Sequence, residues 1–403
     1  MENSLQLSII IPIYNDFDDL QDLFNNFDVE SIEQEVEYVF IDSSSIDSSE
    51  NFFESIKKRI PDQNIVYKKI EPSYAGKSMN LGVDIARGKY IGFLDTKTIP
   101  VGDWPNNYIA ELENKDIDVV LGNTKYFAYS RFQKILKAAS YGEVLHETVP
   151  GSIIKAEKLK LLSPFQENLR ASYDIVWKED VKDSLNFSNP SYQSIIYKSL
   201  PLRLIDTLKK YFIYSLHTAK SDVQQNLKQT YLSILLILSA LLVPRWNYLL
   251  PSWDQHPLYV ADITKIYLFS VLLLLAVILI INRVFPRNKS SNIFLNSIKL
   301  IAFLLVSYSV YRWNAVFAQW IESAVLYIPH ITKIYLVSLI LLSIVYRGLV
   351  MPIQRKEAIS FLFPLKWVQI GSLGLLIDIV KMPGYTLGAL NGLLKDIFSR
   401  ERN

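Results

Sequence analysis

Long stretches almost free of charged residues in the second half of the chain limit most strongly what it can fold into. Sixteen residues between Lys228 and Arg245, and seventeen between Lys265 and Arg283, include no Asp, Glu, Lys or Arg. A helix that spans a bilayer needs about 20 mainly apolar residues. We therefore predict transmembrane helices near 229–250, 264–284, 292–312 and 330–351.

A further apolar segment, 359–380, is interrupted by Pro364, Lys366 and Asp378. It is predicted to be a fifth span or a re-entrant or interfacial helix. Buried core helices would also be apolar, but four such segments in succession, with tryptophans near their edges, favour a membrane bundle. Basic residues in the short loops, such as Arg283, place the amino-terminal half on the cytoplasmic side of an inner or plasma membrane under the positive-inside rule.

The first half of the chain, 1–199, alternates short β-rich runs with amphipathic patterns, which is typical of an α/β domain with a mainly parallel sheet. The predicted strands are 7–13, 36–41, 65–69, 90–94, 119–121 and 194–198. The predicted helices are 16–27, 45–60 and 78–86. Gly88 follows the last of them, where glycine often closes a helix in the left-handed conformation.

Residues 200–228 join the two halves, with an apolar stripe that includes Leu208 and basic residues such as Lys210 on other faces. A basic amphipathic helix of this kind is predicted to lie on an anionic membrane surface, the alternative being a helix packed on the soluble domain. The spans would then occupy 229–355, and a C-terminal apolar or amphipathic segment 356–403.

Composition excludes several classes of function. The chain has 42 Lys and Arg against 40 Asp and Glu, so its bulk charge does not favour a nucleic-acid partner. It has no cysteine, which excludes disulfides, thiolate metal sites and cysteine nucleophiles. The chemistry must therefore come from carboxylates, lysines and hydroxyl groups.

Polar residues follow three of the predicted strands. Asp95 comes directly after the strand at 90–94, Asp42 ends the strand at 36–41, and the first strand runs into Pro12, Tyr14 and Asn15. Open α/β sheets bind ligands at the carboxyl ends of their strands. We expect these residues to share one ligand site.

Two further segments carry candidate residues. Gly76, Lys77 and Asn80 lie where a glycine turn leads into a helix, an arrangement that can receive a phosphate, although Lys77 would also suit an ordinary surface position. The second segment, Phe165–Trp177, includes a carboxylate at Asp174.

These motifs, in this order over roughly residues 5–180, resemble the family-2 glycosyltransferases, which have the A-type nucleotide-diphospho-sugar transferase fold. The resemblance implies that Asp42 contacts the nucleotide base, that Lys77 contacts the diphosphate, and that Asp174 is the general base. It assigns to the nucleotide-sugar site Pro12, Tyr14, Asn15, Asp42, Lys77, Asn80, Asp95 and Lys97. Asp180, the alternative base, lies too far along the chain relative to Trp177.

The chain departs from the family pattern at the metal motif. Asp-x-Asp is replaced by Asp95-Thr96-Lys97, while Ser43 and Tyr173 replace acidic residues elsewhere. In the family, Asp95 would be catalytic and would hold Mg²⁺ or Mn²⁺, but the ammonium of Lys97 cannot be a ligand. Three outcomes follow: Asp95 holds the metal alone, Lys97 substitutes for the ion, or the site no longer turns over.

The sequence therefore predicts a membrane-bound glycosyltransferase that moves one sugar from a nucleotide-diphosphate sugar to a lipid-linked or polysaccharide-precursor acceptor. The resemblance implies inversion at the sugar carbon. The Gln-x-x-Arg-Trp signature of processive relatives is missing from 175–228, which indicates non-processive transfer. The alternative is a catalytically inactive relative that binds nucleotide sugar or serves as a membrane scaffold.

Overall fold

The computed structural model describes residues 5–27, 32, 35–44, 64–114, 116–221, 340–341 and 343–400. The predicted helix 45–60 and the predicted spans at 229–250, 264–284 and 292–312 lie outside the described residues, as does half of 330–351. The chain divides into two units, and the first comprises Met1–Val223 together with Ile344–Asp378. These boundaries differ from the predicted ones, because a C-terminal segment belongs to the same unit as the α/β domain.

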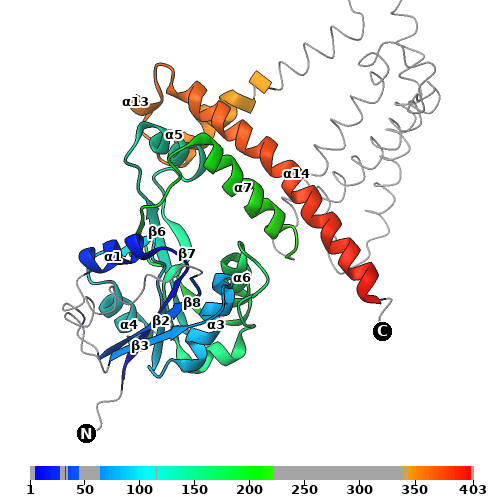
Figure 1. Ribbon diagram of the computed structural model, residues 1–403. Coiled ribbons are helices and arrows are strands. Elements are labelled where there is room, and N and C mark those ends of the chain that lie inside the picture. Colours follow the sequence, from blue (N-terminus) through cyan, green and yellow to red (C-terminus); the bar gives the residue numbers. More distant parts are fainter. Residues whose placement is uncertain are drawn as a thin grey trace, which may run out of the picture. The chain divides into compact units, whose positions relative to one another are not determined.

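Among the described residues, nine strands form one sheet at the centre of this unit (Figure 1). Their order is β3-β2-β1-β4-β7-β6-β9-β5, with β8 beside β6. Their bounds are β1 Leu7–Ile13, β2 Val36–Asp42, β3 Ile65–Lys69, β4 Tyr90–Phe93, β5 Thr98–Pro100, β6 Val119–Tyr126, β7 His146–Lys155, β8 Phe187–Ser188 and β9 Ile195–Tyr197. The predicted strands at 7–13 and 65–69 are confirmed residue for residue.

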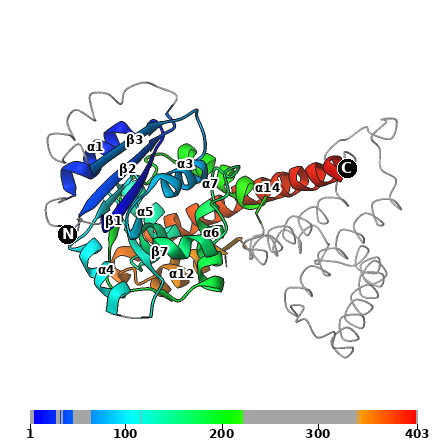
Figure 2. The ribbon, with the colours of Figure 1, turned by 90° about the horizontal axis from the view of Figure 1, so that it is seen from below.

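Helices cover both faces of the sheet, with α1 and α4 on one side and α3 and α6 on the other (Figure 2). The helix bounds are α1 Phe17–Asn26, α3 Ala75–Ile85, α4 Trp104–Asn114, α5 Arg131–Ser140, α6 Tyr173–Ser184, α7 Leu204–Thr218, α12 Met351–Gln354, α13 Ile359–Leu362 and α14 Lys366–Arg400. A 3₁₀ helix at Ala156–Leu161 and a π-helix at Tyr346–Val350 complete the set.

The first strand shows why both layers form. Leu7, Ile9 and Ile11 point into the core beneath α1 and α4, whereas Ile10 points into the core beneath α3 and α6. Successive side chains of a strand alternate between the two faces of a sheet. A strand with both faces covered is therefore mainly apolar, and in this segment only Ser8 is polar.

The sheet is mixed: among the described residues five of the eight strand pairings are parallel, in agreement with the prediction of a mainly parallel sheet, and three are antiparallel. Strands β1 to β4 pair in parallel, but β7 is antiparallel to both β4 and β6, and β5 is antiparallel to β9. The physical reason lies in α5, whose Leu136 and Ala138 pack on the C-terminal helices. A helix that does not cross the sheet lets β7 return beside β6 in the opposite direction.

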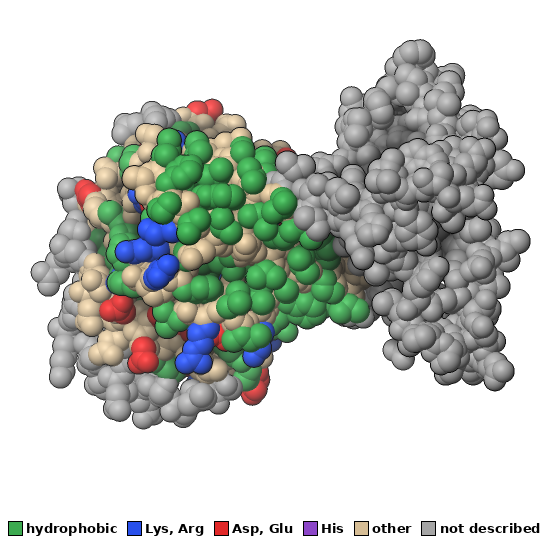
Figure 3. All heavy atoms as spheres, turned by 90° about the horizontal axis from the view of Figure 1, so that it is seen from above, with side chains coloured by type: hydrophobic (Ala, Val, Ile, Leu, Met, Phe, Trp, Pro, Cys, Tyr) green, Lys and Arg blue, Asp and Glu red, His purple; other side chains and the backbone are tan. Residues whose placement is uncertain are grey.

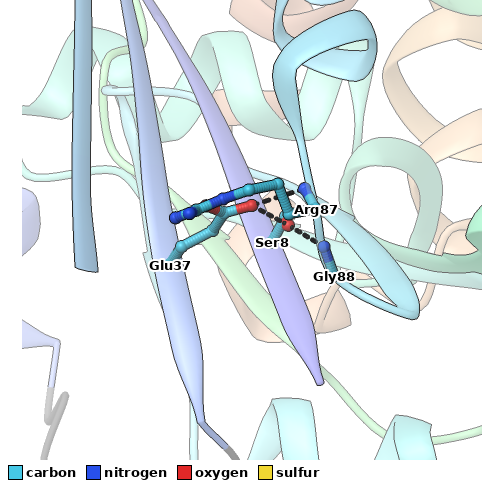
Figure 4. Close-up of polar contacts among 4 residues, drawn as sticks. All are labelled: Ser8, Glu37, Arg87 and Gly88. Atoms are coloured by element: carbon cyan, nitrogen blue, oxygen red, sulfur yellow. Dashed lines mark hydrogen bonds and ion pairs between the residues drawn. The ribbon is translucent and has the colours of Figure 1, made fainter. Parts of the chain in front are cut away.

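Gly88 does not have the predicted left-handed conformation. Helix α3 ends at Ile85, and its C-cap, Ala86, is extended. The Gly88 amide donates to Ser8 Oγ at 2.7 Å, and a Cβ on Gly88 would lie 2.6 Å from the Ser8 nitrogen (Figure 4). Glycine is needed here because the chain passes so close to β1 that no side chain fits.

A buried carboxylate joins this passage to the next strand. Glu37 of β2 is fully buried, and its Oε1 accepts from Ser8 Oγ at 2.5 Å and from the Arg87 amide at 2.6 Å. Its Oε2 accepts from the Arg87 guanidinium, with Nε at 2.9 Å and Nη2 at 2.7 Å (Figure 4). The network fixes where the chain enters β4, and therefore where that strand ends.

The C-terminal segment packs on the α/β domain. Leu373 and Ile377 of α14 contact Leu136 of α5, and Arg347 pairs with Asp378 at 2.6 Å. The predicted segment 359–380 is thus two helices, α13 and α14, separated at 363–365.

Among the described residues, the one helix long and apolar enough to cross a bilayer covers Lys366–Gly388, with a mean hydropathy of 1.2. A single helix of this kind is weak evidence of a span, because the core helix of a soluble protein has the same composition. The predicted multi-span bundle therefore has no support from the described residues.

Candidate active site

A pocket opens at the carboxyl ends of β1, β2 and β4, where an open α/β sheet is expected to bind its ligand. Its lining consists of Pro12, Ile13, Tyr14, Asp16, Ser43, Ala75, Asp95, Thr96, Lys97 and Tyr173. The structure thus brings together four of the predicted site residues, which are Pro12, Tyr14, Asp95 and Lys97. The other predicted residues lie outside this lining.

The loop after β1 is bound to the loop after β2. Asn15 has a positive φ of 55°, a left-handed conformation that asparagine adopts more readily than most residues. Its backbone amide donates to Ser44 Oγ at 2.9 Å. The hydroxyl of Ser43 donates to the Ile13 carbonyl at 3.1 Å. Serines therefore fasten the two loops, at positions where the family pattern has an acid and a glycine.

Asp42 is fully buried at the end of β2. Its Oδ1 accepts from the Ser44 amide at 2.8 Å, and its Oδ2 accepts from the Tyr67 hydroxyl at 2.8 Å. The carboxylate holds the turn that follows the strand. A carboxylate has about four acceptor positions, so the predicted contact with a nucleotide base stays a prediction.

Two other predicted residues lie on α3, which begins at Ala75 rather than at Ser78 as predicted. Lys77 is exposed in the first turn of this helix. Asn80 holds a distant segment, because its Nδ2 donates to the Phe165 carbonyl at 2.9 Å and its Oδ1 accepts from the Phe165 amide at 2.8 Å. Asn80 therefore positions the segment that leads to Asp174.

The turn after β4 holds a carboxylate and an ammonium group side by side. Asp95 Oδ1 accepts from the Lys97 amide at 2.9 Å, and Lys97 Nζ lies 2.8 Å from Asp16 Oδ1. Burial acts to lower the pKa of Lys97. The hydrogen bond and charge of Asp16, with the charges of Asp95 and Asp19, outweigh burial and raise that pKa above its usual value. Lys97 is therefore a cation with its own counter-ion, and sequence reasoning missed Asp16.

A divalent cation fits this site poorly. Mg²⁺ and Mn²⁺ take oxygen ligands, and no group of three or more His, Cys, Asp or Glu side chains that could hold a metal is found in the described part of the chain. Asp95 offers a single carboxylate at the position of the family motif. The ammonium of Lys97 lies where the second ligand would be.

Asp174 lies in the first turn of α6, next to Tyr173 of the pocket lining. It is half-buried, and its pKa is raised by burial and by the charge of Asp95, while Lys178 acts to lower it. Asp180 has a different role, because its Oδ2 accepts from the Ser163 amide at 2.7 Å.

Helix α7 contributes residues that sequence reasoning assigned to an outer face. Lys210 Nζ lies 5.4 Å from the ring centroids of both Tyr197 and Tyr214. The charge of Asp95 contributes to raising the pKa values of Tyr197 and Tyr214, and Tyr197 pairs in the sheet with Thr98, the residue after Lys97. The spacing of Lys210 and Tyr214 in the sequence could have indicated that the two side chains lie together, since residues four apart share one face of a helix.

An α/β domain of this kind, with carboxylates gathered where its strands end, defines the class of nucleotide-binding α/β folds. Residues 8–169 match the model of the family described as Glycosyl transferase family 2. The similarity to this family thus covers 162 of the 403 residues, which is less than half of the chain. Asp174 and Lys210 both lie beyond the matched residues.

Named relatives match shorter stretches. The glycosyltransferase GlyG of Streptococcus pneumoniae is 24% identical over 123 residues, which are 30% of this chain and 40% of that protein. The minor teichoic acid biosynthesis protein GgaA of Bacillus subtilis is 40% identical over 98 residues, which are 22% of this chain and 21% of that protein. The chain thus spans less than half the length of either relative. The crystal structure of Staphylococcus aureus TarS 1-349 has 16% identity and a TM-score of 0.38, covering 69% of this chain and 81% of that one.

Proposed function

We propose that this protein transfers a single sugar from a nucleotide-diphosphate sugar to a lipid-linked or polysaccharide-precursor acceptor of the cell envelope, for which a teichoic-acid-type polymer is the leading class. The observation that carries the proposal is the pocket at the strand ends, which is lined by Asp95, by Lys97 and by Tyr173, the neighbour of Asp174. Burial raises the pKa of Asp174, and the charge of Asp95 adds a smaller contribution. The name of GgaA supports the class of acceptor.

The proposed step is a direct displacement. An acceptor oxygen bonds to the anomeric carbon of the sugar while its proton passes to the Asp174 carboxylate. The bond from the anomeric carbon to the diphosphate oxygen breaks, and its electron pair leaves with the diphosphate. Because attack and departure occur on opposite faces, the configuration inverts. A raised pKa suits Asp174 as a base, because a general base works best when its pKa lies closer to the working pH.

We further propose that transfer depends weakly or not at all on a divalent cation. Lys97 replaces the second acid of the metal motif in the sequence, and its ammonium group pairs with Asp16. We expect the purified protein to keep most of its transfer rate in excess EDTA, measured as release of nucleoside diphosphate. Loss of the rate in EDTA, with full recovery on adding Mn²⁺, would contradict this prediction.

An exposed apolar face supports attachment to a membrane. Exposed side chains at the start of α7 and around α13 include Leu202, Ile205, Ile359, Phe363 and Leu365. Figure 3 shows hydrophobic side chains over a broad area of the described surface, with lysine and arginine side chains toward one edge. We propose that this face lies on the cytoplasmic leaflet, so that an acceptor near the headgroups reaches the site.

The test of the proposed function is transfer itself. Membranes that contain the protein are incubated with radiolabelled UDP, GDP and dTDP sugars, and label is followed into lipid and polymer fractions. Label in either fraction supports the proposal. A protein that binds a nucleotide but transfers nothing to any fraction would be an inactive relative, the second function considered for this chain.

A further inference from the structure

Lys210 is a lysine whose surroundings lack a counter-ion. It is half-buried on α7, with Nζ 3.4 Å from the Tyr197 hydroxyl and above the rings of Tyr197 and Tyr214. Among the side chains that the structure describes, no carboxylate forms an ion pair with it. Lysine is rarely buried without such a partner, because an ammonium group removed from water loses its hydration.

The second lysine of the site is different. Lys97 has Asp16 at 2.8 Å and is neutralised within the protein. Lys210 lies in the field of both Lys97 and Asp95, two residues of the pocket lining. The pKa of Lys210 is lowered to about 8, by burial first and by the charge of Lys97 second, while Asp95 opposes both. An anion bound in the pocket would stabilise the ammonium form of Lys210 and offset the free-energy cost of its burial.

The contacts of Lys210 place it beside the turn after β4, on the donor side of the site. Its Nζ lies 3.4 Å from the hydroxyl of Tyr197, and Tyr197 pairs in the sheet with Thr98, the residue after Lys97. Lys97 and Asp95 of this turn also act on the pKa of Lys210. We infer that Lys210 binds the diphosphate of the nucleotide-sugar donor and stabilises its charge as it departs. This inference rests on the proposed function and names the residue that supplies the cation.

The inference predicts that nucleotide affinity falls as pH rises. The ammonium form of Lys210 declines as pH rises through about 8, so affinity declines with it. The other groups that face Lys210 keep their charge across this range, because the pKa values of Lys97, Tyr197 and Tyr214 are all raised. A change near pH 8 therefore reports Lys210.

The experiment is calorimetric titration of the full chain in detergent with UDP, GDP and dTDP at pH 7 and pH 9. We expect the dissociation constant of the nucleotide that binds to rise about tenfold between these values. In Lys210→Met, affinity at pH 7 should fall by a similar factor and become independent of pH. In Lys210→Arg, which stays charged at both values, affinity should persist at pH 9. Lys209→Met, an exposed neighbour, is the matched control and should follow the wild type.

Three results would contradict either the inference about Lys210 or the proposed function, and they distinguish between the two. If Lys210→Met keeps both the affinity and the pH dependence of the wild type, the inference is wrong while the proposed function stands. If the nucleotide affinity of Lys210→Met is intact but its KM for the acceptor rises, the lysine binds an acceptor phosphate and the inference is also wrong. If the wild type binds no nucleotide at either pH, the proposed function itself fails.

Discussion

Replacing Asp174 by asparagine is expected to lower the transfer rate by about 10² to 10⁴-fold, the range that a positioned general base contributes. The amide keeps the size of the side chain but cannot accept the acceptor proton. Asp95 would remain in place, so nucleotide binding should change little. The measurement is the transfer rate with saturating donor, together with the dissociation constant of the nucleotide.

The matched control is Asp180→Asn, six residues along the same helix. Its carboxylate accepts from the Ser163 amide, a bond that asparagine can also accept, so transfer should persist. Asp174→Asn should also stay folded. The pKa of the Asp174 carboxyl group is raised in the folded state, so the folded protein becomes less stable as pH rises through that pKa and the group ionises. The amide of asparagine does not ionise and avoids this loss. Full transfer by Asp174→Asn, with none by Asp180→Asn, would reverse the assignment.

Replacing Arg87 by methionine is expected to destabilise the α/β domain by about 2 kcal/mol, because a buried acceptor would lose its partners. The carboxylate of Glu37 is fully buried, and it would lose both guanidinium hydrogen bonds. The Arg87 side chain is itself 62% exposed, so the loss is smaller than for an ion pair buried on both sides. The measurement is the midpoint of thermal or denaturant unfolding of the detergent-solubilised protein.

Two further variants isolate the cause. Arg131→Met removes an exposed arginine at the start of α5 and should change stability by less than about 0.5 kcal/mol. The double variant Arg87→Met with Glu37→Gln should recover part of the loss, because a buried amide carries no charge. If the double variant is no more stable than Arg87→Met alone, the buried charge is not the cause of the loss.

Local patterns in the sequence were reliable where one segment determines its own structure. The apolar run that forms β1 and the short strand β3 were predicted to the residue. For β1 the reason is that a strand covered on both faces is mainly apolar. Gly88 was assigned to a helix cap from the same kind of reasoning, and this was wrong. Its role depends on Ser8, 80 residues earlier in the chain, which no local pattern encodes.

The features of the candidate site also divide into those that the sequence predicts and those that only the tertiary structure reveals. The sequence by itself determined which carboxylates end the strands, since Asp42 and Asp95 directly follow apolar runs. Only the tertiary structure decided how their neighbours pair: Asp16 neutralises Lys97, and α7 turns Lys210 toward the site. The direction of β7 was also decided there, by where α5 packs. The physical reason is that strand ends follow from local hydrophobic order, whereas ion pairs and strand directions depend on contacts between residues far apart in the chain.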